Sequence, residues 1–357
     1  MQDDVRVMPW LESIAPADVR PYHVQVEVTW RCNWRCVHCY QDDHTVEVLS
    51  TSDLERLFEQ LREAGTMHLI VTGGEPLVRR DIFEVLEAAR RCGLAITLYT
   101  NAHRVTRELA TRLARVVALA EVSILSGDDH VHDELCRVRG AAQRAWSGIA
   151  HLTAAGVDVV VKTPLLSPAV GTFVALEQRV RTLGLEWNPD PEVSRSYAGA
   201  DFPLAYALSP AQLAAFYADL PRYRPRAGTR SADPGAPAGL CLAGRQYAFV
   251  DAHGDVYPCL SFKAASDART RRGEPGARLG NIRERSFAEL WHSHALLDEI
   301  RGATRSSFDR CSTCTGACHP CMAANYEENG ALFQPAASRC APRHRLAVLG
   351  AGTTGGR

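Results

Sequence analysis

Three cysteines near the start of the chain are the residues whose types and spacing most directly indicate chemistry. Cys32, Cys36 and Cys39 have the spacing CxxxCxxC and follow the apolar, β-branched run 23–30. Thiolates are soft ligands that bind iron–sulfur clusters or zinc. Three ligands on a four-iron cluster leave one iron open to a chelating small molecule, whereas a zinc knuckle needs a distant fourth ligand. The spacing favours the cluster.

A second motif, Gly73-Gly74-Glu75-Pro76, follows the apolar run 67–72. A double glycine after a strand is typical of a tight turn. Glycine also lets the backbone approach a ligand closely, and Glu75 adds a carboxylate that can pair with an ammonium group. The cysteine motif upstream favours the ligand-binding interpretation of this turn.

Together, the two motifs resemble the signature of the radical S-adenosylmethionine (AdoMet) superfamily. The resemblance implies that the open iron of a 4Fe–4S cluster on the three cysteines binds the methionine end of AdoMet. It further implies reductive cleavage of AdoMet to a deoxyadenosyl radical, which abstracts hydrogen from a substrate. The implied AdoMet contacts are His38 beside the adenine, Gly73, Gly74 and Glu75 at the methionine amino group, Asn101 near the ribose, Ser123 at a strand end, and Arg137 or Arg139 at the carboxylate.

The chain departs from the family pattern at two of these contacts. Ala102 follows Asn101 where the family has glycine, and Leu125-Ser126 stands where the family has Asp-Gly. The spacing around Arg137 and Arg139 also differs slightly from the common form. A solvated basic turn is the alternative interpretation for either arginine alone.

The C-terminal half contains Gly254-Asp255-Val256-Tyr257-Pro258-Cys259, with Cys241 upstream, and the run Cys311-x2-Cys314-x3-Cys318-x2-Cys321. These residues resemble the SPASM extension, which carries auxiliary 4Fe–4S clusters, although the usual later element there is CxxCxxxxxCxxxC. The resemblance implies that three cysteines hold a first auxiliary cluster and four hold a second, so that the first has one iron without a cysteine. A pair of zinc ribbons is the alternative interpretation. The cysteines are Cys241, Cys259 and Cys321 for the first cluster and Cys311, Cys314, Cys318 and Cys340 for the second.

Strand-like and helix-like segments alternate between these motifs. Strands are expected at 23–30, 67–72, 95–100, 119–125, 157–162 and 185–187, and helices at 81–91, 105–117, 141–155, 172–183 and 210–219. Another helix is expected to begin at Ser52, capped reciprocally by Glu55. Alternation of this kind predicts an α/β fold with a parallel sheet. The family version is a partial (β/α)6 barrel with the C-terminal cysteine-rich SPASM extension.

The expected organisation has five parts. They are an N-terminal lead-in at 1–20, the barrel at 21–221, a Pro-, Gly- and Arg-rich linker at 222–238, the SPASM domain at 239–342 and a flexible tail at 343–357. Residues 264–278, rich in Arg, Ala and Gly, are interpreted as a mobile insertion.

Composition narrows the class of protein. The net charge of -1 argues against nucleic-acid binding, and no stretch approaches the length of a membrane span. The start of the chain lacks the features of a signal peptide. Twelve cysteines without a signal peptide indicate metal ligation in the reducing cytoplasm.

We therefore predict a radical AdoMet enzyme of the SPASM group with three 4Fe–4S clusters. Its predicted reaction is the oxidative modification, through a crosslink, of a ribosomally made peptide. The expected partners are that peptide, a flavodoxin or ferredoxin-type reductant and, if a leader is read, a separate recognition protein. The alternatives are an AdoMet-dependent dehydrogenase of a small alcohol or sugar, and an iron–sulfur electron carrier. The Gly73-Gly74-Glu75-Pro76 motif argues against the carrier, which has no need of an AdoMet pocket.

Overall fold

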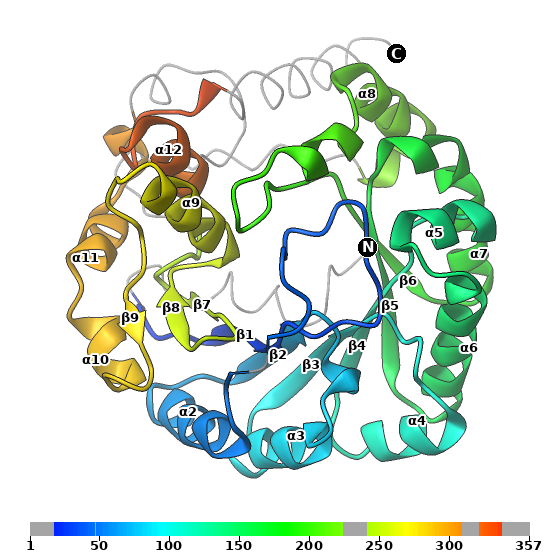
Figure 1. Ribbon diagram of the computed structural model, residues 1–357, viewed down its shortest axis with the longest axis horizontal. Helices are drawn as coiled ribbons and strands as arrows, with labels where there is room; N and C mark the ends of the chain where they lie inside the picture. Colours follow the sequence, from blue (N-terminus) through cyan, green and yellow to red (C-terminus); the bar gives the residue numbers. More distant parts are fainter. Residues whose placement is uncertain (1–17, 47, 224–240, 309–320, 338–357) are drawn as a thin grey trace, which may run out of the picture.

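A computed structural model describes residues 18–46, 48–223, 241–308 and 321–337 of the chain (Figure 1). In these residues one sheet of nine strands curves around the molecule, in the order β6-β5-β4-β3-β2-β1-β7-β8-β9. The strands are β1 (His23–Thr29), β2 (His68–Gly73), β3 (Ala95–Thr100), β4 (Leu119–Ser123), β5 (Asp158–Pro164), β6 (Glu186–Asp190), β7 (Tyr247–Val250), β8 (Asp255–Tyr257) and β9 (Gly280–Asn281).

The first six strands are parallel and lie in chain order, which is the predicted partial barrel. The C-terminal half continues the same sheet. Strand β7 pairs in parallel with β1, from His23 opposite Tyr247 to Val26 opposite Val250, and β8 and β9 follow in antiparallel. The sequence analysis did not predict that the cysteine-rich half would be joined to the barrel through β1.

Most helices of the N-terminal half lie outside the sheet, whereas the helices of the C-terminal half lie around β7, β8 and β9 (Figure 1). The helices are α2 (Thr51–Glu63), α3 (Ile82–Arg91), α4 (Arg107–Leu113), α5 (Asp129–Cys136), α6 (Ala141–Ala154), α7 (Phe173–Thr182), α8 (Pro210–Asp219), α9 (Leu260–Arg271), α10 (Phe287–His292), α11 (Ala295–Gly302) and α12 (Met322–Asn329). Short 3-10 turns span Pro76–Val78, Ser167–Thr172, Phe202–Tyr206, Pro221–Tyr223 and Arg305–Ser307. None of the helices in the described residues is long and apolar enough to cross a membrane.

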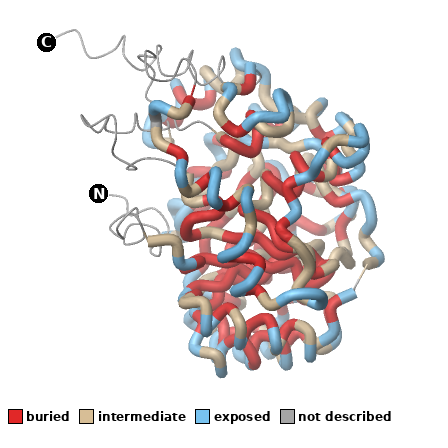
Figure 2. Tube along the Cα trace, turned by 90° about the vertical axis from the view of Figure 1, so that its left-hand side faces the viewer, coloured by how far each residue is buried: buried red, intermediate tan, exposed pale blue. Residues whose placement is uncertain are grey.

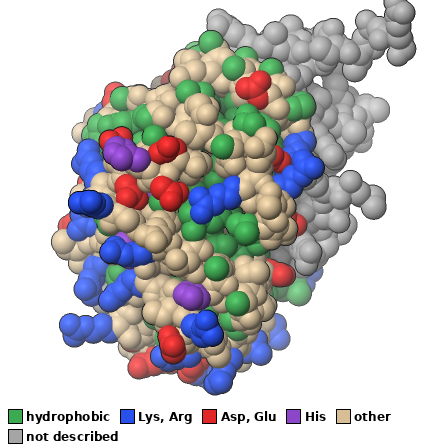
Figure 3. All heavy atoms as spheres, turned by 90° about the vertical axis from the view of Figure 1, so that its right-hand side faces the viewer, with side chains coloured by type: hydrophobic (Ala, Val, Ile, Leu, Met, Phe, Trp, Pro, Cys, Tyr) green, Lys and Arg blue, Asp and Glu red, His purple; other side chains and the backbone are tan. Residues whose placement is uncertain are grey.

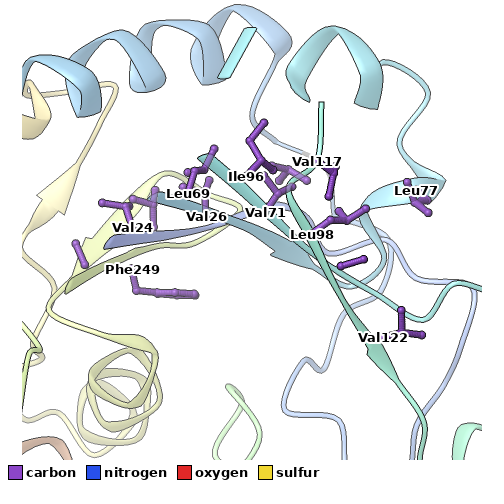
Figure 4. Packing of buried hydrophobic residues seen from close by; sticks show 14 of the residues in the cluster. Val24, Val26, Leu69, Val71, Leu77, Ile96, Leu98, Val117, Val122 and Phe249 are labelled. Atoms are coloured by element: carbon purple, nitrogen blue, oxygen red, sulfur yellow. The ribbon is translucent and has the colours of Figure 1, made fainter. Parts of the chain in front are cut away.

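The alternation of side chains along the strands separates an apolar outer face from a polar inner face. Val24, Val26, Leu69 and Val71 lie in the buried cluster that packs beneath the outer helices (Figure 4). Figure 2 shows that the buried segments are concentrated inside the molecule. The intervening residues of β1, which are His23, Gln25, Glu27 and Thr29, are polar yet also buried. The inner face is therefore where buried polar groups must find partners.

Two loops occupy the space that the inner face encloses (Figure 1). They are residues 30–46, called the cluster loop here because they hold the first three cysteines, and residues 191–207. The two loops touch, since the backbone N–H of Tyr197 donates to the carbonyl of Tyr40 at 2.6 Å. The C-terminal ends of the parallel strands lead into these loops, which places the predicted chemistry at that end of the barrel.

Three local features of the structure differ from the sequence predictions. The helix α2 is capped by Ser50 with Asp53 as the reciprocal partner, not by Ser52 with Glu55. Its predicted apolar stripe of Leu54, Leu57, Phe58 and Leu61 is buried as expected. The helix α5 was not predicted.

Most of the predicted insertion at 264–278 is instead helical, because α9 continues to Arg271. Four of its residues in that range, Ala265, Ser266, Ala268 and Arg269, are buried. The composition of the segment was misleading because its small residues pack rather than loosen the chain.

Candidate active site at the cluster loop

The three cysteines of the cluster loop lie together at the end of β1. Cys32, Cys36 and Cys39 are half-buried. Burial raises the pKa of the Cys32 thiol to about 12 and that of Cys39 to about 11, and the neighbouring thiols raise the pKa of Cys36 further. The thiols are therefore protonated at neutral pH unless a positively charged centre binds them.

Backbone contacts with α5 hold the cluster loop in place. The N–H groups of Arg35 and Val37 donate to the carbonyls of Cys136 and Leu135, at 3.0 and 2.9 Å. The indole of Trp34 is buried and donates to His103 Nδ1 at 3.0 Å. The unpredicted helix α5 thus presents its last carbonyl groups, which have no partner within the helix, to the cysteine motif.

The donor chemistry of this loop fits an iron–sulfur cluster with one open iron. Soft sulfur donors are grouped, and a cavity of about 530 Å³ lies beside Cys36 and Cys39, lined also by Arg35, Gln41 and Arg137. The described residues contain no group of three His, Cys, Asp or Glu side chains placed to hold a single metal ion.

Gly73 and Gly74 allow the turn after β2 to pack against the cluster loop. A Cβ on Gly73 would lie 2.0 Å from the Thr29 carbonyl oxygen, and one on Gly74 would lie 2.5 Å from the carbonyl oxygens of Trp30 and Arg31. Gly73 also has a φ of +143°, which a side chain rarely tolerates. The glycines are therefore required by loop-to-loop packing, a reason that sequence reasoning did not find.

Glu75 is buried, and its carboxylate is bonded within the protein. It accepts hydrogen bonds from the backbone N–H of Leu77 at 3.0 Å, the Thr100 hydroxyl at 2.8 Å and the backbone N–H of Asn101 at 2.6 Å. Burial raises the pKa of Glu75. In this arrangement Glu75 joins the glycine turn to the end of β3.

Asn101 continues this connection to the cysteine motif. Its side-chain amide donates to Asn33 Oδ1 at 2.8 Å, so β3 is tied to the cluster loop. The next residue, Ala102, has a φ of +53° and is fully buried. This left-handed conformation explains why glycine suits that position, and why alanine there carries strain.

The other predicted AdoMet contacts are spread around the cluster loop. The ring of His38 has a buried Nδ1 without a partner among the described residues, and burial lowers its pKa to about 4. Ser123 is half-buried at the end of β4. Arg137 and Arg139 are both exposed, but Arg137 lines the cavity beside Cys36 and has a left-handed φ of +56°. The geometry thus favours Arg137 over Arg139 as a ligand contact.

Three cysteines of the C-terminal half also lie together. Burial raises the pKa of the Cys259 thiol, and the nearby thiols of Cys241 and Cys321 raise it further. Cys259 occupies the N-cap position of α9. Cys136 lies instead beside Cys36. The remaining predicted ligands, Cys311, Cys314, Cys318 and Cys340, lie outside the described residues.

A buried polar cluster between the cysteine groups was missed by the sequence analysis. Glu27 accepts hydrogen bonds from the Trp30 indole at 2.5 Å, from Gln41 at 3.3 Å and from the Tyr197 hydroxyl at 3.0 Å. These contacts hold both central loops on β1. The alternation of polar residues within the apolar run 23–30 was the available signal.

Lys263 of α9 fastens the C-terminal half to this cluster. Its ammonium lies 2.7 Å from Asp267, 3.3 Å from Asp251 at the end of β7, and 4.5 Å from the Tyr197 ring centroid. Lys263 lies one helical turn after Cys259. The ion pairs therefore fix where this cysteine sits relative to the barrel.

A second cavity, of about 1300 Å³, opens between the loop 191–207 and helices α9 and α12. Arg195 crosses one side of it, pairing with Asp201 at 2.5 Å and with Glu327 of α12 at 2.8 Å. Its lining carries both signs of charge. Pockets for small molecules typically span about 300–1,000 Å³, so this cavity is large enough for an extended substrate.

Comparison with known proteins agrees with this geometry. The sequence profile of the radical SAM superfamily matches residues 26–169, and that of the SPASM iron–sulfur cluster-binding domain matches residues 241–322. The chain is 26% identical over 339 residues to an AdoMet-dependent heme synthase of Oleidesulfovibrio alaskensis, covering 85% of this chain and 83% of the relative. It is 28% identical over 324 residues to the mycofactocin maturase MftC of Mycobacterium ulcerans, covering 84% and 82%.

A solved structure supports the fold. Streptococcus suis SuiB bound to its precursor peptide SuiA superposes with a TM-score of 0.68 at 16% identity, over 90% of this chain and 76% of SuiB. The same protein has been solved with S-adenosylmethionine.

The fold and the two cysteine groups define an iron–sulfur enzyme built on a partial barrel. The chain belongs to the radical SAM superfamily and carries a SPASM domain. Its cofactors are 4Fe–4S clusters and AdoMet, as the two domains imply.

Proposed function

We propose that this enzyme oxidatively modifies a ribosomally made peptide, forming a crosslink. The observation that carries the proposal is the cavity of about 1300 Å³ between the barrel and the C-terminal half, whose size suits a chain rather than a small alcohol or sugar. The similarity to a mycofactocin maturase supports the same class of substrate.

In this proposal Cys32, Cys36 and Cys39 hold the AdoMet-binding cluster. Cys241, Cys259 and Cys321 hold the first auxiliary cluster, and Cys311, Cys314, Cys318 and Cys340 the second. When bound, the cluster on Cys32, Cys36 and Cys39 would supply the electron that reduces AdoMet and generates the oxidant for hydrogen abstraction. A flavodoxin or ferredoxin-type protein would supply the electron. We propose the same domain limits as those predicted from the sequence.

The protein's own residues arrange the groups. Glu75 and Asn101 hold the glycine turn and β3 against the cluster loop, and Gly73 and Gly74 let that turn approach it. Arg137 is proposed to meet the AdoMet carboxylate because it lines the cavity beside the cysteines. His38 and Ser123 are proposed to complete the AdoMet site, with the adenine against the His38 ring.

The test is mass spectrometry of short precursor peptides incubated anaerobically with the reconstituted, reduced enzyme and AdoMet. A crosslink removes two hydrogen atoms from the peptide: one would go to the deoxyadenosyl radical, and the second would leave as a proton while its electron passes to an auxiliary cluster. Tandem spectra locate the joined residues. The matched control replaces Cys32, Cys36 and Cys39 by alanine. Peptides of unchanged mass, despite AdoMet cleavage by the wild-type enzyme, would contradict the proposal.

Heme synthesis is a second candidate, because relatives of that name match over a similar share of the chain. Its test uses the same assay with an iron porphyrin in place of the peptide. Formation of heme from the porphyrin would favour this candidate over the peptide.

A further inference from the structure

A group of polar side chains lies on the inner face of the barrel, on the side away from the C-terminal half. Tyr99 of β3 is in register with Glu121 of β4. On β4 the flanking residues Ala120 and Val122 belong to the outer apolar cluster, so Glu121 points to the inner face. Lys162 of β5 is in register with Ser123, two residues further along β4. Four strands thus contribute to this inner-face group, with Asp190 at the end of β6.

Glu121 is the member of the group with an unsatisfied atom. It is only 4% exposed, and its Oε2 is buried without a hydrogen-bond partner among the described residues. Burial raises the pKa of Glu121, whereas the charge of Lys162 lowers it. The Tyr99 side chain lies opposite Glu121 in the β3–β4 register and also lowers the pKa of this carboxyl group. A buried carboxylate oxygen without a donor is costly, so a bound donor would stabilise it.

The cation of this group, Lys162, already has a partner among the described residues. The Lys162 ammonium lies 3.0 Å from Asp190 Oδ2, and both side chains are partly exposed, at 28% and 36%. The group therefore holds two carboxylates and one ammonium. A second positive charge would balance it, whereas another carboxylate would add a like charge.

Two other inner-face acids in the part of the chain that the structure describes have donors or a cation of the protein beside them. Glu27 accepts three hydrogen bonds from Trp30, Gln41 and Tyr197. Asp251 is ion-paired with Lys263. These acids hold the two halves of the chain together. Asp251 Oδ2 also lacks a hydrogen bond but lies 3.3 Å from the Lys263 ammonium, whereas Glu121 Oε2 has neither a hydrogen bond nor an ion pair among the described residues.

We propose that Glu121, with Tyr99 and Asp190 beside it, binds a protonated amine or guanidinium group of the substrate. The inference rests on the proposed function and specifies it, because a peptide would supply that group as a lysine or arginine side chain. The site lies next to Ser123, at the predicted AdoMet-binding end of the strands. A basic side chain held there would place neighbouring substrate carbons near the oxidant.

The experiment measures binding without turnover. Reconstituted, AdoMet-loaded but unreduced enzyme is mixed with a random library of acetylated heptapeptide amides, and the retained peptides are identified by mass spectrometry. Butylamine and butylguanidine, compared with butyrate, are tested separately by saturation-transfer NMR. The variants are Glu121→Gln, which keeps the shape of the side chain, and Glu84→Gln, an exposed change on α3 that serves as the control.

The expected result is enrichment of lysine and arginine by about tenfold over glutamine among the retained peptides, since a charge-assisted hydrogen bond contributes about that much. Glu121→Gln should abolish the enrichment and the butylamine signal, and Glu84→Gln should not. The affinity for AdoMet, measured by equilibrium dialysis, should be unchanged in both variants.

The outcomes separate this inference from the proposed function. Peptides retained without a preference for basic residues would overturn the inference alone. Amine binding that depends on Glu121, without peptide retention, would support the inference and contradict the peptide substrate. Binding of neither probe would overturn the inference, as would a loss of AdoMet affinity in Glu121→Gln, because Glu121 would then be a cofactor contact.

Discussion

At the scale of single residues, the candidate site depends on glycine, because the missing Cβ leaves room for close contact between two backbone segments. Gly74 lies where the turn after β2 meets the carbonyl oxygens of Trp30 and Arg31. The motif indicated a backbone close to a ligand, and the structure adds that the backbone is also close to the cluster loop. A side chain at Gly74 would therefore disturb the cysteines as well as AdoMet.

We expect Gly74→Ala to weaken AdoMet binding on the order of tenfold to a hundredfold, because small displacements in a site cost that much. It should also lower the iron content of the first cluster, since the cluster loop must move. Gly171→Ala, whose Cβ would meet nothing within 4 Å, is the matched control. Equilibrium dialysis and iron analysis provide the measurements. Wild-type AdoMet affinity in Gly74→Ala would refute this account of the turn.

A second residue-scale prediction concerns Glu27, whose pKa burial raises from 4.5 to about 7. Between these values the folded protein keeps a proton that the unfolded chain has released. Stability from this group is therefore lost as the pH rises through that window, by up to about 3 kcal/mol. The glutamine side chain in Glu27→Gln does not titrate, so this variant lacks the pH dependence that Glu27 contributes.

Urea unfolding of the reconstituted protein at several pH values between 5 and 8 checks this expectation. The difference in free energy of unfolding between wild type and Glu27→Gln should shrink toward high pH. The exposed residue Glu87 on α3 provides the control, because Glu87→Gln should give a difference that is independent of pH. A difference curve for Glu27→Gln that is equally flat would contradict the raised pKa.

At the scale of elements, the sequence predicted strands and long amphipathic helices well and short or atypical ones poorly. β3 and α8 have their predicted bounds, and the stripe on α2 is buried as expected. The helix α5 was missed because Asp128, which caps it, follows a segment interpreted only as a departure from the family pattern. The helix α9 was mistaken for an insertion because Ala and Arg composition says nothing of what packs against it.

Lys263 attaches α9 to the barrel through a buried ion pair with Asp251. Removing its charge leaves Asp251 buried without its cation, so Lys263→Met should lower the free energy of unfolding by about 3–5 kcal/mol. The double variant Lys263→Met/Asp251→Asn removes both charges and should recover part of that loss. Hydrogen exchange of α9 should rise in the single variant, because the helix loses its attachment to the barrel. A double variant no more stable than the single one would argue against the buried pair as the cause.

At the scale of the whole molecule, one sheet joins the two groups of cysteines. The first group follows β1, and Cys259 follows β8, which pairs with β7 beside β1. No sequence pattern indicated that the two halves share a sheet, because strand pairing between distant segments depends on tertiary packing. The shared sheet therefore connects the two proposed cluster sites, although each site uses its own cysteine ligands.

Because the two sites use separate cysteine ligands, we expect the iron of each cluster to be lost independently of the other. Alanine at Cys32, Cys36 and Cys39 should remove about four irons, the content of one cluster, and abolish AdoMet cleavage. Alanine at Cys241, Cys259 and Cys321 should remove a similar amount while AdoMet binding persists, since these cysteines lie in the other group. Cys136→Ala serves as the control: its backbone carbonyl, not its thiol, receives the Arg35 N–H, so it should keep all the iron. Iron and sulfide analysis with electron paramagnetic resonance of the reduced proteins distinguishes the two clusters. AdoMet cleavage that survived the first triple substitution would exclude that group as the AdoMet site. Loss of iron from either cluster in Cys136→Ala would show that Cys136 is a ligand.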